Sequence, residues 1–346
     1  MNNRFFAIYL ICTLVSCSQN RPEYKLPDFS EEVDCEFELI GDEITFFPKD
    51  IEIKGDYIIA TGFESETGNT LFVFDKSAGT LLRKGIKKGR GPSETMLGYR
   101  DICMSGDSVV YHDILESVRM TFSLEDFLSK NSFPVIKRKL DLPQWKKSFV
   151  DCPDGRMAIL RSKGYQSPDT IPVRSVIIRD PDGEEYSYDE DPLDDPQRTF
   201  IGSLFARMEV SPSSERLALI SSLGLVTEIF DIRDGIRLIH REYYIPPEFK
   251  VVGGSYELLP GYRYGMNHTC SDAEHIYVAY DGDNVFPNRS LLKFKNVALF
   301  DWNGNPEKLY KTEYEIYALA IDNFAGHLYA LLDTGEGGYR LGRLRI

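Results

Sequence analysis

Hydrophobic and polar residues alternate in short runs along most of this chain, a pattern typical of β-strands. A short apolar run that opens on a turn residue recurs six times, as DYIIA at 56, DSVVY at 107, GRMAIL at 155, ERLALI at 215, EHIYVAY at 274 and GHLYALL at 326. Successive copies lie 48 to 60 residues apart. Further apolar runs flank them, and several end in an Asp-x-x-Gly-type turn, as in VIIRDPDGEE. About four strands in a repeat of this length are typical of a β-propeller blade.

The repeats predict an all-β, six-bladed β-propeller over residues 35–346. The last repeat ends with YRLGRLRI at the C-terminus and lacks one strand, while CEFELIG at 35–41 precedes the first repeat and has no blade of its own. An unpaired strand edge invites aggregation. We therefore expect the N-terminal strand to join the C-terminal blade and close the ring. The 20 Tyr and 21 Phe suit strands that pack face to face.

The N-terminus has the features of a secretory signal. Residues 1–16 contain one cation, Arg4, followed by an apolar run too short to span a membrane as a mature helix. The sequence LVSC resembles a bacterial lipobox, and this resemblance implies cleavage before Cys17 and lipidation of Cys17. An ordinary signal peptide that happens to contain a cysteine is the alternative.

Residues 17–34 are predicted to be the lipidated cysteine and an extended tether, because they combine prolines and acidic residues with little apolar periodicity. Ser18, Gln19 and Asn20 follow the lipidated position, with no aspartate among them. By resemblance to known sorting signals, this favours the outer membrane of the cell envelope. The periplasmic and surface leaflets are not distinguished.

The chain is acidic, and this narrows its partners. Removal of Arg4 with the leader takes the formal net charge from −14 to −15. Nucleic acid and anionic headgroups are therefore poor partners, and membrane attachment is expected through acyl chains on Cys17. The remaining cysteines lack CxxC or zinc-type spacing, which favours buried thiols over a disulfide. These are Cys35, Cys103, Cys152 and Cys270.

One stretch, KGIKKGRGPSET at 84–95, combines glycines and cations. A phosphate-binding loop would need a helix after the glycines, and a nucleic-acid patch would need interleaved aromatic residues. We interpret the stretch as a corner between two blades. Gly89 and Gly91 would supply positive φ angles, Pro92 would stiffen the exit, and Glu94 would accept hydrogen bonds from loop amides.

GRGPSE followed by DICMSGDSVVYHDILE resembles an NHL-type propeller repeat. Together with the lipobox, the tether and six repeats, it resembles the TolB-like six-bladed propeller lipoproteins of Bacteroidetes over nearly the whole chain. The resemblance implies a cell-envelope lipoprotein with a propeller fold and implies no established reaction. It also implies a structural role for Asp113, which falls on the second strand of its repeat.

Propellers often bind ligands at the mouth of the central channel, near the starts of the innermost strands. The predicted positions there form a cationic and aromatic set, which would suit an anionic or sugar-like ligand. Alternatively, these side chains point sideways and pair with nearby carboxylates. The set comprises Lys49, Arg100, Lys147, Arg207, His268 and Tyr317.

Enzyme signatures are sparse, since the chain has neither HExxH nor Gly-x-Ser-x-Gly. We therefore favour a non-catalytic binding or scaffold module for a protein, peptide or glycan, and predict no catalytic residue and no cofactor. The alternative is a metal-dependent propeller hydrolase or lyase, of the lactonase or amidating-lyase type. It would hold calcium or zinc in the channel, with Asp101, Asn267 and His268 as candidate ligands.

Overall fold

The structure is a computed structural model. It describes residues 26–96, 102–113, 116–130, 132–140, 147–163, 173–189, 206–221, 224–245, 249–252, 255–258, 265–281, 294–335 and 338–346. The proposed leader, Cys17 and the first part of the tether lie outside these residues. Within them, no helix is long and apolar enough to cross a membrane.

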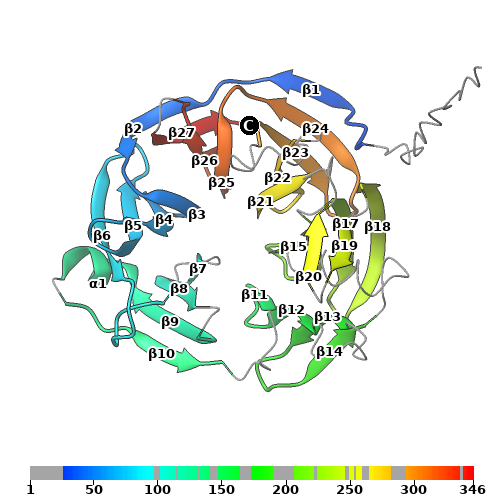
Figure 1. The fold of residues 1–346 in the computed structure, drawn as a ribbon, viewed down its shortest axis with the longest axis horizontal. Coiled ribbons are helices and arrows are strands. Elements are labelled where there is room, and N and C mark those ends of the chain that lie inside the picture. Colours follow the sequence, from blue (N-terminus) through cyan, green and yellow to red (C-terminus); the bar gives the residue numbers. More distant parts are fainter. Residues whose placement is uncertain are drawn as a thin grey trace, which may run out of the picture.

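The described strands form a six-bladed β-propeller, which confirms the predicted fold (Figure 1). Blades 1 to 4 are four-stranded antiparallel meanders, and in every blade the first strand of the repeat lies nearest the central axis. Blade 1 comprises β3 (Phe47–Lys54), β4 (Tyr57–Phe63), β5 (Asn69–Asp75) and β6 (Leu81–Lys87). Blade 2 comprises β7 (Ile102–Ser105), β8 (Ser108–Asp113), β9 (Val118–Ser123) and β10 (Ile136–Lys139), with the short helix α1 (Leu124–Ser129) before β10.

Blades 3 and 4 repeat this arrangement. Blade 3 comprises β11 (Lys147–Asp151), β12 (Met157–Lys163), β13 (Val173–Arg179) and β14 (Glu185–Tyr188). Blade 4 comprises β15 (Ala206–Val210), β16 (Arg216–Ser221), β17 (Leu225–Asp231) and β18 (Arg237–Ile245). A separate hairpin, β19 (Phe249–Val252) and β20 (Ser255–Leu258), follows blade 4.

The last two blades each take an extra strand from the N-terminal segment. Blade 5 comprises β21 (Met266–Ser271), β22 (His275–Tyr280), β23 (Asn296–Asp301) and β24 (Pro306–Lys311), and β1 (Glu31–Asp34) pairs in parallel with β24. Blade 6 comprises β25 (Glu315–Asp322), β26 (His327–Asp333) and β27 (Tyr339–Arg345), and β2 (Glu38–Ile44) pairs antiparallel with β27. Closure of the ring by its two ends is therefore confirmed.

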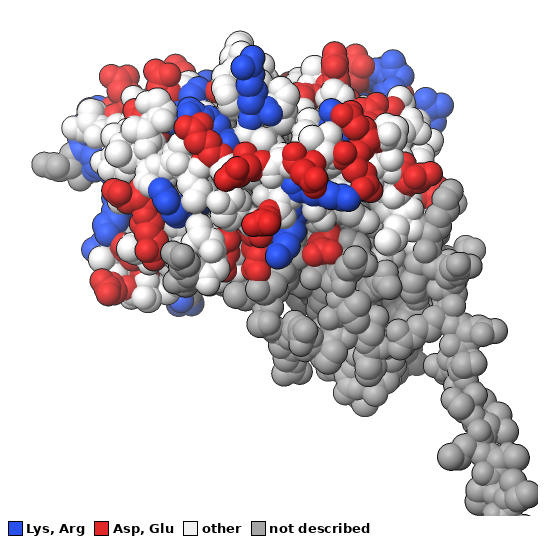
Figure 2. All heavy atoms as spheres, turned by 90° about the horizontal axis from the view of Figure 1, so that it is seen from above, with Lys and Arg blue, Asp and Glu red and all other residues white. Residues whose placement is uncertain are grey.

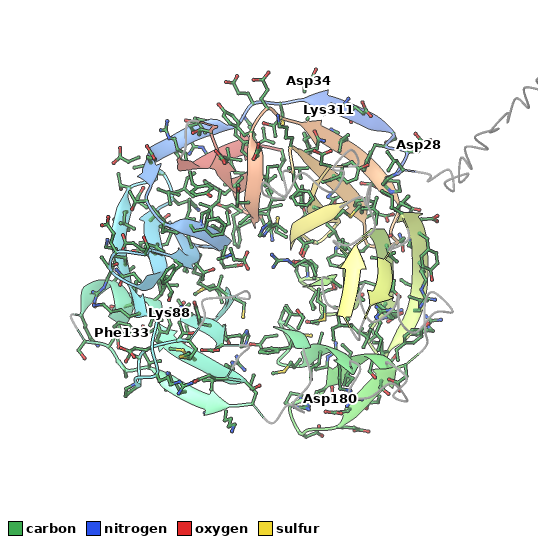
Figure 3. The ribbon with its side chains drawn as sticks, in the orientation of Figure 1. Asp28, Asp34, Lys88, Phe133, Asp180 and Lys311 are labelled. Carbon is green, nitrogen blue, oxygen red and sulfur yellow. The ribbon has the colours of Figure 1, made fainter. Side chains whose placement is uncertain are left out.

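Residues 31–34 of the predicted tether form β1 and already pair with blade 5. In β1, Asp34 lies beside Lys311 at the outer rim, as Figure 3 shows. Upstream of it, the Phe29 ring makes edge contacts with Tyr280 and Phe300, at centroid distances of 5.7 and 5.8 Å. Without the N-terminal segment, the outer edge of β24 would expose unpaired backbone groups. The segment pairs with them through β1 before it reaches blade 6.

The core lies between neighbouring blades. Central strands are buried on both faces, as in β4, where Ile58, Ile59 and Ala60 are fully buried. A strand that is covered by protein on both faces needs apolar side chains at consecutive positions. This requirement explains the repeated apolar motif in the sequence. The rim, unlike the core, carries many charged side chains. Figure 2 shows Asp, Glu, Lys and Arg interspersed over the side of the molecule. The side chains drawn in Figure 3 fill the space between neighbouring sheets.

Candidate functional site

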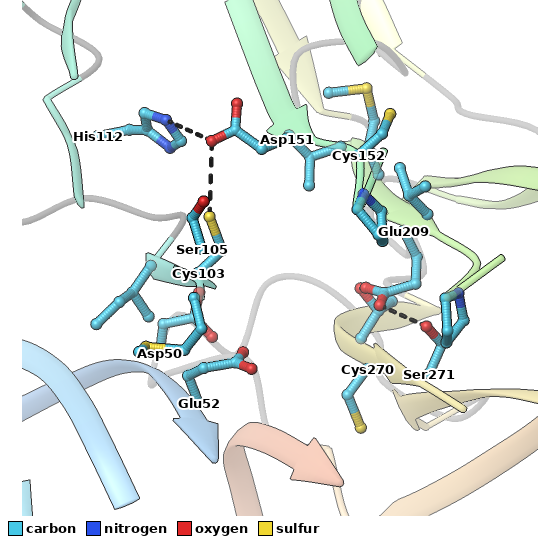
Figure 4. A pocket seen from close by; sticks show the side chains of 18 of the residues that line it. Asp50, Glu52, Cys103, Ser105, His112, Asp151, Cys152, Glu209, Cys270 and Ser271 are labelled. Atoms are coloured by element: carbon cyan, nitrogen blue, oxygen red, sulfur yellow. Dashed lines mark hydrogen bonds and ion pairs between the residues drawn. The ribbon is translucent and has the colours of Figure 1, made fainter. Parts of the chain in front are cut away.

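The central channel contains a cavity of about 570 Å³. It is lined by the innermost strands β3, β7, β11, β15 and β21, together with Leu319 of β25. Side chains alternate between the two faces of a strand, so residues two apart share a face. This alternation places Asp50 and Glu52 together on β3, and Arg207 and Glu209 together on β15. Figure 4 shows Asp50, Glu52 and Glu209 in the lining of the cavity.

Glu209 is held in place by two hydroxyl groups from blade 5. Ser271 Oγ donates to Glu209 Oε1 at 2.8 Å, and Thr269 Oγ1 donates to Oε2 at 3.0 Å. Burial raises the pKa of Glu209 to about 7; the two hydroxyl groups lower it, Asp50 raises it and Arg207 lowers it. The carboxyl group is therefore fixed in orientation and titrates near neutral pH.

Glu52 faces the same cavity without such support. Among the described residues, no hydroxyl or amide group donates a hydrogen bond to its carboxylate. Burial raises the pKa of Glu52 to about 8, and the negative charges of Asp50 and Glu209 add to this rise. Both glutamates are half-buried, because solvent reaches them through the channel while protein surrounds them elsewhere.

The opposite wall, formed by blades 2 and 3, carries a paired carboxylate. Asp151 Oδ2 lies 2.9 Å from Arg119 Nη2 and 3.7 Å from His112 Nε2, and the Cys103 thiol lies 3.8 Å from the same oxygen. Burial raises the pKa of Asp151, and Arg119 partly offsets that effect. His112 is fully buried, with its ring edge-on to Phe149 at a centroid distance of 4.5 Å.

The described lining of the cavity is thus acidic, while the cationic set predicted for the channel mouth includes residues that the structure does not describe. The described lining contains four carboxylates, two arginines and one histidine. The expectation considered only the starts of the inner strands, and the carboxylates lie further along them. The alternating charges in KDIEIK and ARMEV were the signal that could have found them.

Two of the predicted mouth residues, Arg207 and His268, contact each other, whereas Lys49 lies over an aromatic ring. Arg207 Nη2 lies 3.1 Å from His268 Nδ1, and His268 has a positive φ of 44° at a register shift between β21 and β22. Such a bulge turns a side chain away from its regular direction. On the other side, Lys49 Nζ lies 4.4 Å from the ring centre of Phe47.

Tyr317 is a core residue, which differs from its predicted role as an open stacking face. It is 8% exposed and makes edge contacts with Phe47 and Tyr339, at centroid distances of 6.1 and 4.9 Å. Packing between blades 6 and 1 covers the ring. Arg100, Asp101 and the side chains of Lys147 and Asn267 lie outside the described residues.

The corner between blades 1 and 2 is built around Glu94 and keeps its glycines for a different reason from the expected one. Gly91 N donates to Glu94 Oε2 at 2.7 Å, but neither Gly89 nor Gly91 has a positive φ. A Cβ atom on Gly89 would lie 2.0 Å from Glu94 Oε2. Glycine at residue 89 thus leaves room for the carboxylate, which a side chain there would displace from Gly91 N. Lys137 Nζ donates to the Gly91 carbonyl at 2.7 Å and ties the corner, which Pro92 also shapes, to β10.

Asp113 supports the segment that follows this corner. It is buried, and it accepts hydrogen bonds from Thr95 Oγ1 and Met96 N, both at 2.8 Å, and from Glu116 N at 3.1 Å. Its carboxylate thereby replaces strand partners that the loop cannot provide.

A second hollow, of about 750 Å³, lies between blades 5 and 6. Its charged groups pair with one another: His275 Nδ1 lies 3.4 Å from Asp272 Oδ1, His275 Nε2 lies 3.2 Å from Glu307 Oε2, and Lys308 Nζ lies 2.9 Å from Glu31 Oε2. Because these charges satisfy each other, this hollow gives less reason than the channel to expect a ligand.

Metal-ligating residues are dispersed in the described part of the chain, which contains no group of three or more His, Cys, Asp or Glu placed to hold a metal ion. Of the predicted candidates, only His268 has a described side chain. The four described cysteines are free thiols. Burial raises the pKa of Cys152 to about 12 and that of Cys270 well above its usual range, so neither is a reactive thiolate.

No protein-family model matches the chain, and no curated protein matches it. Among solved structures, the chain is similar to an exported protein of Bacteroides fragilis, with 13% identity, a TM-score of 0.53 and coverage of 91% of this chain and 99% of that one. It is also similar to regucalcin, a calcium-binding protein of Agrobacterium tumefaciens, with 14% identity, a TM-score of 0.50 and coverage of 91% and 95%. The RRP9 WD40 repeats share 7% identity, with a TM-score of 0.52 and coverage of 92% and 99%. At these identities, each similarity shows the propeller fold alone.

Proposed function

We propose that this protein is a non-catalytic binding protein of the bacterial cell envelope, which holds its ligand in the central channel. The observation that carries the proposal is the cavity of about 570 Å³, within the usual range for small-molecule sites. Polar side chains converge on it from several blades, and a rigid ring holds them in position. The ligand is a small molecule, or one residue or sugar unit of a larger peptide, protein or glycan.

The envelope location rests on the N-terminal sequence. The lipobox-like LVSC supports a lipid anchor at Cys17, and the residues after it support the outer membrane. A six-bladed ring with these features also agrees with membership of the TolB-like propeller lipoproteins, some of whose repeats are NHL-like.

Ligand capture tests this function. The whole chain would be expressed in a bacterial host, extracted from membranes in mild detergent, and analysed by native mass spectrometry for retained small molecules. We expect one bound molecule per chain, and we expect Ser105→Trp to abolish retention because Ser105 is exposed at the lining of the cavity. Ser65→Trp, on an exposed loop far from the lining residues, is the matched control.

The same cells report on the anchor, since Cys17→Ala should move the protein out of the membrane fraction. A folded wild-type protein that retains nothing, or a Ser105→Trp variant that retains as much as wild type, would contradict binding in the channel. A stoichiometric calcium or zinc ion, together with turnover of a lactone or ester, would instead favour the hydrolase or lyase alternative.

A further inference from the structure

Glu52 presents an uncompensated charge to the channel cavity. No described hydrogen-bond donor contacts its carboxylate, and the charges that act on it from β3 and β15 include those of Asp50 and Glu209, which are also negative. Glu52 and Glu209 point into the cavity from two sides (Figure 4). A carboxylate that is partly desolvated and beside other carboxylates is unstable as an anion, so it must take up either a proton or a cation.

The arginines near the cavity do not supply that cation. Arg119 pairs with Asp151 within the wall formed by blades 2 and 3, at 2.9 Å. Arg207 lies against His268 at 3.1 Å, and its charge acts on Glu209. Among the described side chains, Glu52 therefore has no opposite charge beside it when it is ionised, that is, above its pKa of about 8.

A bare metal ion is a poorer fit than an organic cation. Calcium requires six or more oxygen ligands, and no group of three or more ligating side chains exists in the described residues. An ammonium group has three donors, which two carboxylates can satisfy. The cavity lining also includes two partly exposed apolar residues, Met104 and Val150. A volume of about 570 Å³ accommodates an organic molecule of this amphipathic type.

We infer that the channel cavity binds a small organic amine, with its ammonium group held between Glu52 and Glu209 and its apolar body against the partly exposed apolar residues of the lining. This inference rests on the proposed function of the channel as a ligand site. Ser271 and Thr269 orient Glu209, whereas Glu52 gains its partner only when the amine binds. Binding therefore displaces a proton from the glutamates, and affinity rises with pH until both are ionised.

Other titratable groups share this cavity with Glu52 and belong to the same equilibrium, while β25 faces it with Leu319 alone. Among the described residues, these groups are Asp50 on β3, Cys103 on β7, His112 on β8, Arg119 on β9, Asp151 on β11 and Cys152 directly after it, Arg207 and Glu209 on β15, and Cys270 on β21. Burial raises the pKa of Glu52 to about 8 and that of Glu209 to about 7, so both glutamates titrate near neutral pH.

Isothermal titration calorimetry with phenethylamine tests the inference on the whole chain in detergent, with 2-phenylethanol as the neutral probe of the same shape. We expect binding of the amine at pH 8.5, at least tenfold weaker binding at pH 5.5, and a heat that varies with the ionisation enthalpy of the buffer. Glu52→Gln and Glu209→Gln should each weaken binding at least tenfold, whereas Glu66→Gln, on an exposed loop, should leave it unchanged.

Absence of amine binding to a folded wild-type protein would overturn the inference, as would equal binding of 2-phenylethanol or unchanged affinity in both glutamine variants. Calcium binding that depends on Glu52, without amine binding, would also overturn it. If the channel captured a neutral or anionic molecule, the inference of an amine ligand would be wrong and the proposed function would stand. Capture of nothing would count against the proposed function itself.

Discussion

Buried charges between blades 3 and 4 are paired with opposite charges. In the channel, by contrast, Glu52 has no such partner among the described residues. Arg174 and Glu228 have side chains that are each 4% exposed, and their groups meet in a two-pronged pair in which Arg174 Nη1 lies 3.1 Å from Glu228 Oε1. Arg241 Nε donates to the same oxygen at 3.1 Å. Every charge there has an opposite charge beside it, whereas Glu52 in the channel has none among the described residues.

This difference distinguishes charges that stabilise the fold from charges that we propose to bind a ligand. A bidentate arginine–carboxylate pair that is closed from solvent can be maintained by the fold alone. A half-buried carboxylate without a donor costs free energy in the isolated protein, and such positions concentrate at ligand sites. The comparison predicts opposite signs for substitutions in the two regions.

The largest effect is expected at Glu228. Glu228→Gln would leave the buried Arg174 without its counter-charge, so the free energy of unfolding should fall by about 3–5 kcal/mol. Urea denaturation followed by circular dichroism would measure this. Glu185→Gln is the matched control, because the Glu185–Arg179 pair lies at the surface and should contribute at most about 1 kcal/mol. Equal effects at the two glutamates would break the comparison.

An intermediate effect is expected at Asp113. Asp113→Ala would leave three donors in the loop after the corner without their acceptor, and should lower the free energy of unfolding by about 2–3 kcal/mol. Asp75→Ala is the control: Asp75 accepts from Ser77 and Ala78 in a turn at the surface, where water can replace it. Denaturation midpoints would rank the two, and a smaller loss at Asp113 than at Asp75 would contradict its structural role.

The smallest effect, and one of opposite sign, is expected at Glu52. Since its pKa is raised to about 8 in the folded protein, the folded state binds more protons than the unfolded chain, and the free energy of unfolding should fall as pH rises from about 5 to about 8. Glu52→Gln removes this loss and should stabilise the ligand-free protein by roughly 1–2 kcal/mol at pH 8. Thermal unfolding across that pH range would measure it.

Glu66→Gln, whose parent side chain is exposed, should leave the pH profile of unfolding unchanged. A Glu52→Gln variant that is less stable than wild type at pH 8 would place Glu52 among the structural charges.

Much of the fold followed from local pattern. Six copies of one apolar motif predicted the blades, because a strand buried on both faces needs a continuous apolar run wherever it occurs. The missing strand of the last repeat predicted closure by the N-terminal segment, and β2 supplies that strand. The parallel pairing of β1 with β24 was not predicted, since residues 31–34 carry no strand-like alternation of their own.

The arrangement of side chains in the site could be predicted from the sequence less well than the fold. Starts of inner strands suggested a cationic mouth, yet Tyr317 is covered by neighbouring blades and Lys49 lies over Phe47. At the corner, the residues named were the ones used, while the reason for Gly89 is the position of the Glu94 carboxylate. Both differences concern contacts between side chains that sequence spacing does not report.

The sequence by itself determined the repeat, the number of blades and the strand that closes the ring, because these depend on alternation and chain order. Only the tertiary structure decided which of the described charges are paired and which have no opposite charge beside them. Glu52 and Glu209 belong to different blades, and closing the ring brings both to the same cavity. Their burial and mutual repulsion, which set their protonation, arise only in that arrangement.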